Sequence, residues 1–109
     1  MKVLILPEVR QYFKELSYTL YEKGYFCFLD SSEKYVDDLV DDIKTNLPLK
    51  PKKPAPKHFD RYGKGMYYAT FRKNKQTQWY AFFKMYRVND EIIYQVRYIS
   101  NNHVIAQYL

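Results

Sequence analysis

Cysteine, glycine and long apolar runs are all scarce in this chain, which has one Cys and three Gly in 109 residues. The single cysteine, Cys27, excludes a disulfide within one chain, and its place in the apolar run 25 to 29 predicts a small buried thiol. The first apolar run, 3 to 6, meets Pro7 and Glu8 at once and does not resemble a signal peptide. No stretch approaches the roughly 18 apolar residues of a membrane span, so we expect a cytoplasmic protein with no membrane partner.

Acidic residues are scarce in the second half of the chain. Residues 50 to 109 contain three Asp or Glu against twelve Lys or Arg, a net charge of +9, whereas residues 1 to 49 contain nine against six, a net charge of −3. The basic excess is interleaved with Tyr, Phe and Trp, which is typical of a surface that binds phosphates and stacks bases. A polyanionic partner is one interpretation. A solvated lysine-rich surface around a tyrosine-rich core is the other.

Length and composition predict a single domain, residues 1 to 109. The hydrophobic fraction of 47%, with 13 Tyr and 7 Phe, is enough for one compact core. The acidic run at 37 to 42 falls on a predicted helix and lacks the glycine and the regular ligand spacing of a calcium loop. We therefore expect a solvated acidic helix face, no metal site and no cofactor.

The first half of the chain predicts a short strand and two amphipathic helices. Residues 2 to 6 suit a strand, Pro7 suits the first position of a helix, and Gly24 ends that helix. Asp30 and Glu33 have the spacing of a capping box for the second helix, with Ser31 or Ser32 as alternative caps. Apolar residues recur at helical spacing in both helices. They are Val9, Phe13, Leu16 and Leu20, then Val36, Leu39, Val40, Ile43 and Leu47.

The second half predicts a basic connector and then a β-meander. Four prolines between 47 and 61 exclude a regular helix or a central strand there, so this segment is either a plain linker or the wall of a binding groove. Strands are expected at 66 to 73, 78 to 88 and 91 to 100, with polar turns between them. Residues 103 to 109 predict a short exposed or edge-paired tail.

Together these elements predict an α+β fold, in which a short N-terminal strand and two N-terminal helices pack on an antiparallel β-meander. Alternation along 78 to 88 divides the strand into two aromatic faces. One carries Trp79, Ala81, Phe83 and Met85, and the other carries Tyr80, Phe82, Lys84 and Tyr86. We expect helices over one face and a ligand or partner over part of the other.

Three short segments carry a resemblance to a known family. They are YYATFR at 67 to 72, WYAFF at 79 to 83 and VRYISNNH at 96 to 103. In this order they resemble the second, third and last strands of RelE/ParE-type toxins of bacterial type II toxin–antitoxin systems. The resemblance implies a cognate antitoxin protein as a partner. It also implies one of three roles: metal-independent endoribonuclease acting on mRNA in the ribosome, DNA gyrase inhibitor acting by binding, or degenerate member that only binds the antitoxin.

The ribonuclease role is the first hypothesis. Cleavage by the 2′-hydroxyl requires a base, an acid and a group that offsets charge on the phosphate. The resemblance implies His103 as the acid or base, and Arg97 as the phosphate ligand, because a guanidinium binds two oxygens at once. Tyr108 is the candidate for stacking or proton donation. Basic residues expected to bind the RNA are Lys50, Lys52, Lys53, Lys57, Arg61, Lys64, Arg72, Lys73 and Lys75.

Each of the three candidates also has a purely structural interpretation. His103 can be a surface residue of a turn, and His58, beside the prolines, is the weaker of the two histidines. Arg97 shares strand parity with Gln95 and Ile99, so its stem can pack on the sheet, and Tyr108 can attach the tail to the core. No Lys or Arg follows Arg97, where both groups of toxins commonly carry one. That departure leaves His103 prominent and favours the ribonuclease.

Overall fold

The computed structural model describes residues 1 to 109 and has an α+β architecture built on one mixed five-stranded sheet. The elements in chain order are β1 (Lys2–Ile5), α1 (Pro7–Glu22), α2 (Leu29–Asn46), η1 (Leu47–Leu49), β2 (Lys53–Pro54), η2 (Lys57–Tyr62), β3 (Tyr67–Arg72), β4 (Gln78–Val88), β5 (Glu91–Asn101), α3 (Asn102–Ile105) and η3 (Ala106–Tyr108). The strand order is β1-β5-β4-β3-β2. The antiparallel meander of β3, β4 and β5 is as predicted, while β1 pairs with β5 in parallel and β2 pairs with the outer edge of β3.

Both predicted helices are present, but the cap predicted for the second is wrong. The residue that precedes α2 is Phe28, and it makes no side-chain cap. Asp30 and Ser32 already lie inside the helix, where the Ser32 hydroxyl donates a hydrogen bond to the Leu29 carbonyl at 2.8 Å. Because Ser32 is fully buried, this bond satisfies a hydroxyl that would otherwise be unpaired in the core.

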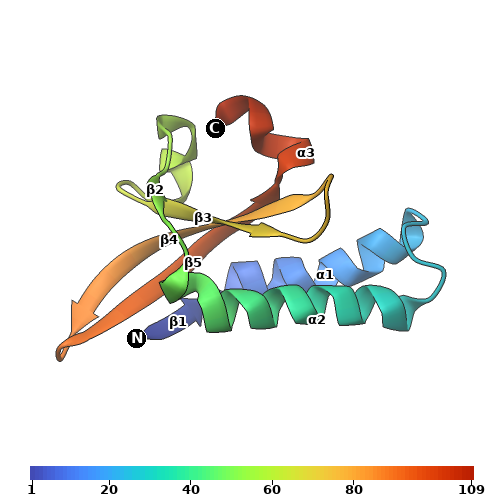
Figure 1. The fold of residues 1–109 in the computed structure, drawn as a ribbon, viewed down its shortest axis with the longest axis horizontal. Coiled ribbons are helices and arrows are strands. Elements are labelled where there is room, and N and C mark those ends of the chain that lie inside the picture. Colours follow the sequence, from blue (N-terminus) through green and yellow to red (C-terminus); the bar gives the residue numbers. More distant parts are fainter.

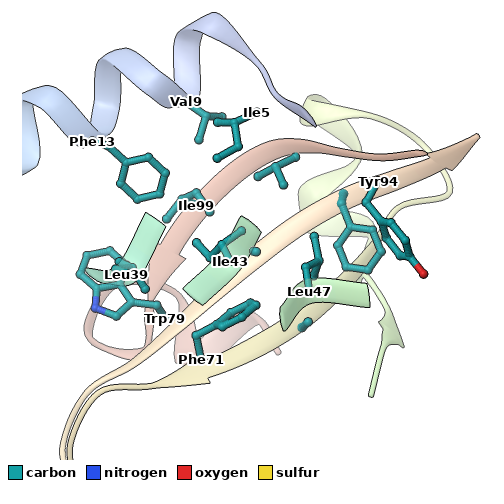
Figure 2. Packing of buried hydrophobic residues seen from close by; sticks show 14 of the residues in the cluster. Ile5, Val9, Phe13, Leu39, Ile43, Leu47, Phe71, Trp79, Tyr94 and Ile99 are labelled. Carbon is teal, nitrogen blue, oxygen red and sulfur yellow. The ribbon is translucent and has the colours of Figure 1, made fainter. Parts of the chain in front are cut away.

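The main core lies between the two helices and one face of the sheet, which we call the helix face. Figure 1 shows α1 and α2 side by side beneath the strands. Figure 2 shows Phe13, Leu39 and Trp79 in one layer, so both helices contribute to the packing against β4. The residues of β4 on this face are Trp79, Ala81, Phe83 and Met85, as the alternation predicted.

The opposite face, which we call the tail face, has a smaller core of its own. Phe59 from η2, Met66, Phe82 from β4 and Ile105 from α3 are all buried in it. Figure 1 shows the segment that follows β2 and the C-terminal α3 on the side of the sheet away from α1 and α2. The residues of the predicted exposed tail, 103 to 109, are exposed except for Ile105, whose burial attaches the tail to this face of the sheet.

An irregularity in the pairing of β4 with β5 changes the strand parity. Phe82 pairs with Tyr98 and Phe83 pairs with Val96, so Arg97 is the extra residue of a β-bulge. As a consequence Ile99 belongs to the core on the helix face. Arg97 bonds to Gln95 on the tail face, so the predicted shared parity of Arg97 and Ile99 is wrong.

The loop between α1 and α2 differs from its prediction as well. Cys27 is exposed rather than buried, because the apolar run 25 to 29 lies in the loop that connects the two helices and not in the core. Tyr25 and Phe28 are each 71% exposed in the same loop. None of the helices is both long enough and apolar enough to cross a membrane.

Candidate nucleic-acid interface

Arg97 is held on the tail face by three neutral acceptors. Its Nε donates to Gln95 Oε1 at 2.8 Å, and its Nη2 donates to the Tyr86 hydroxyl at 3.0 Å. Its Nη1 donates to the Tyr62 carbonyl at 3.4 Å. The bulge turns the side chain towards these partners and fixes the plane of the guanidinium. A guanidinium has five N–H donors, and these three bonds leave the others available for an anion.

Arg97 forms no ion pair, because no carboxylate oxygen lies within 4.0 Å of its guanidinium. The only ion pair in the structure joins Lys34 to Asp38 at 2.9 Å on α2. A second cation lies beside Arg97, because both its side chain and that of Lys84 pack against Gly63: a Cβ placed there would lie 3.1 Å from Arg97 Cδ and 3.5 Å from Lys84 Cδ. Two neighbouring cations without a carboxylate partner form a site for an anion such as a phosphate.

The tail face also carries two pairs of stacked aromatic rings, one of which lies beside Arg97. Tyr62 and Tyr98 stack with ring centroids 3.9 Å apart and planes 8° apart. Burial, and then the neighbouring Tyr98 hydroxyl, raise the pKa of Tyr62 above its usual value, so Tyr62 stays neutral at physiological pH. His58 and Tyr108 form a second stack at 3.6 Å and 5°, which joins η2 to the C-terminal η3. Flat rings beside a cationic pair suit single-stranded nucleic acid.

The structure separates the three predicted catalytic residues. Arg97 lies on the tail face, and Tyr108 stacks on His58 at the C-terminal end of the chain. His103 lies in neither group. It is exposed, its Nε2 is 3.2 Å from the Thr77 hydroxyl, and it lines a cleft with Trp79 on the helix side of the sheet. The step from β5 into α3 therefore does not bring the imidazole of His103 to Arg97.

The nine predicted RNA-binding residues also fall into separate groups. The ammonium groups of three of them lie over aromatic rings of the helix side: Lys50 over Phe71, Lys52 over Tyr94 and Lys73 over Tyr35. Lys53 pairs in register with Tyr68 of the tail-face core. The others are exposed: Lys57 and Arg61 in η2, Lys64 after it, and Arg72 and Lys75 at the β3–β4 hairpin.

The sequence interpretation missed Lys84, Tyr62 and Tyr86, and it ranked His58 below His103. Strand parity already placed Lys84 and Tyr86 on one face, and that signal was available. The sequence carried no comparable signal for the contribution of η2, because the packing of the proline-rich connector against the sheet depends on contacts that are distant in sequence.

Comparisons of the chain with models of protein families, with curated proteins and with solved structures found no match.

Proposed function

We propose that this chain is a toxin of the RelE/ParE type that binds RNA on its tail face and cleaves ribosome-bound mRNA. The observation that carries the proposal is the Arg97 site, where two cations, neither of them in an ion pair, lie beside a pair of stacked tyrosines. The order of strand, two helices and meander, with β1 beside β5, supports the family. RNA is the ligand that uses both the cations and the rings.

In this proposal Arg97 and Lys84 bind the scissile phosphate and offset its charge in the transition state. His58 is the imidazole on the tail face, since it lies in η2, whose Tyr62 carbonyl accepts a hydrogen bond from Arg97. The imidazole of His58 can accept the proton of the 2′-hydroxyl as the new O–P bond forms, and it can then return that proton to the 5′-oxygen as the P–O bond breaks. No metal is required for these steps.

The proposed antitoxin partner has surface available to it at the end of the helical hairpin where the loop connects α1 to α2. Four large apolar or aromatic residues are exposed there: Tyr18 (55%), Tyr21 (39%), Tyr25 (71%) and Phe28 (71%). A cluster of exposed rings is typical of a surface that a partner covers. Co-expression with the product of the adjacent gene tests this, and failure to co-purify at low salt would count against a toxin.

Arg97→Gln tests the RNA-directed activity, with Arg87→Gln as its matched control. Arg87 is exposed on the same sheet and lies outside the Arg97 site. We expect Arg97→Gln to lower cleavage of ribosome-bound message by about 100-fold, the cost of losing one oriented group that stabilises charge. Arg87→Gln should stay within about threefold of the wild type. Equal effects of the two variants would remove Arg97 from the mechanism.

The two histidines can be separated in the same assay. We expect His58→Ala to lower the rate by about 100-fold or more and His103→Ala to have little effect, because only His58 is on the tail face. Loss of cleavage in His103→Ala alone would instead restore the pairing that the family resemblance implies.

A gyrase-directed inhibitor is the second candidate. The separation of His103 from Arg97 favours it, because an inhibitor that acts by binding needs a surface and no acid–base cluster. Inhibition of DNA supercoiling by the purified chain, with no cleavage of message, would select this function.

A further inference from the structure

A cavity of about 650 Å³ opens beside Arg97, between the first turns of α1, the end of η2, β5 and α3. Three tyrosines, Tyr12, Tyr62 and Tyr98, contribute its aromatic walls. The volume is within the usual range for a small-molecule site. It is large enough for one nucleotide.

Two charged side chains of opposite sign line this cavity without pairing. Glu8 comes from α1 and Arg97 from β5. Because Lys34–Asp38 is the only ion pair, the carboxylate of Glu8 and the guanidinium of Arg97 are more than 4.0 Å apart. A ligand that fills the gap must therefore present hydrogen-bond donors to Glu8 and an anionic group to Arg97.

Hydroxyl groups add polar positions between these charges. Ser100 is only 4% exposed, yet it lines the cavity, as does Tyr12. Neither hydroxyl takes part in any of the side-chain hydrogen bonds within the protein. No fully buried polar side-chain atom lacks a partner, so the Ser100 hydroxyl keeps contact with solvent in the cavity and is available to a bound molecule.

Among the four RNA bases, guanine matches this arrangement. Its N1–H and N2–H₂ groups are adjacent donors that a carboxylate can accept with both oxygens. Adenine and cytosine place an acceptor beside their amino group, and uracil has carbonyls on both sides of its N–H. The ring suits the tyrosine walls, and the attached phosphate suits Arg97.

We propose that this cavity binds a guanine nucleotide of the RNA, with Glu8 on the Watson–Crick edge of the base and Arg97 on the phosphate. The inference deepens the proposed function and rests on it. It makes the site selective for guanine, and it gives α1 a direct role in reading the substrate.

Titration of the purified chain with GMP, AMP, CMP and UMP tests the site directly. We expect GMP to bind about tenfold or more tightly than the other three, the size of effect typical of one bidentate contact to a base. Glu8→Gln should abolish the preference. Glu22→Gln, the same change on the same helix but outside the cavity, should retain it. Val104→Trp, at an exposed residue of the rim, should block GMP while leaving the fold intact.

A pair of short single-stranded RNAs, one with a single guanine and one with adenine in its place, distinguishes this inference from the proposed function. Tighter binding of the guanine RNA, lost in Glu8→Gln, supports the site. Equal, salt-sensitive binding of both RNAs, with equal binding of GMP and AMP, would overturn the guanine site and leave RNA binding in place. Selective binding of GMP by a chain that binds neither RNA would support the site and remove the proposed function.

Discussion

Gly63 controls how Arg97 is held. Its φ of +148° is a backbone conformation that residues with a Cβ rarely adopt. A Cβ there would also lie 3.1 Å from Cδ and 3.2 Å from Nη1 of Arg97, closer than ordinary contact allows. Glycine is therefore required at this position for two reasons: the backbone conformation, and the space that the Arg97 side chain occupies. Gly65 also has a positive φ, +71°, but a Cβ there would meet nothing within 4 Å.

We expect Gly63→Ala to lower the free energy of unfolding by about 1–3 kcal/mol through backbone strain and to lower RNA affinity by displacing Arg97. Gly65→Ala is the control, with a cost of about 1 kcal/mol and unchanged RNA affinity. Urea denaturation and RNA titration of both variants give the comparison. An RNA affinity unaltered in Gly63→Ala would mean that the packing against Gly63 does not position Arg97.

Ionisation of the Tyr12 phenol makes the free energy of unfolding depend on pH in the alkaline range. Burial, and then the nearby Tyr98, raise the pKa of Tyr12 from 10.0 to about 12. Below pH 10 the phenol is neutral in both states, and between pH 10 and 12 only the unfolded chain ionises. The stabilisation is thus complete below pH 10 and lost as the pH rises through 12. We expect the free energy of unfolding to fall more steeply over this window in the wild type than in Tyr12→Phe. Parallel pH profiles for the two proteins would show that Tyr12 titrates normally.

Among elements, regular periodicity was predictable and irregular packing was not. Both helices were predictable, because burial of one helix face requires apolar residues at helical spacing in the sequence. The buried residues with this spacing are Val9, Phe13 and Leu16 in α1, and Val36, Leu39 and Ile43 in α2. The bounds of β4, 78 to 88, followed in the same way from alternation. The bulge at Arg97, the two-residue β2 and the fold of the tail depend on partners far away in sequence. The candidate site is built from these parts, which is why His103 was favoured over His58.

Ile105 is the residue of the C-terminal elements that is buried in the core of the tail face. Ile105 is 3% exposed and packs in the small core with Phe59 and Phe82, whereas its neighbour Val104 is 60% exposed. We expect Ile105→Ala to cost about 2–4 kcal/mol of unfolding free energy, the usual range for truncating a buried isoleucine. Val104→Ala should cost less than about 0.5 kcal/mol. Denaturant midpoints measure both, and equal midpoints would mean that the tail is not docked in solution.

At the scale of the whole molecule, the two halves of the sequence differ in charge, and so do the two sides of the sheet. The acidic residues of α2 lie on the helix side, and η2, Lys84 and Arg97 lie on the tail side. The basic connector crosses from one side to the other. Lys50 and Lys52 lie over rings of the helix side, while Lys53 and Lys57 lie on the side of the tail-face core.

Because of this division, two pairs of lysines with the same charge should contribute differently to the salt dependence of RNA binding. If the tail face binds the strand, replacing both Lys53 and Lys57 with Ser should reduce the slope of log K against log salt by about 1.4, or about 0.7 for each lost phosphate contact on single strands. Replacing Lys50 and Lys52 with Ser removes the same charge from the helix side and should leave the slope unchanged. Titration of a short single-stranded RNA at several salt concentrations measures both slopes. Equal reductions would mean that net charge, rather than the tail face, determines binding, because a long-range effect does not depend on which side of the sheet the lysines occupy.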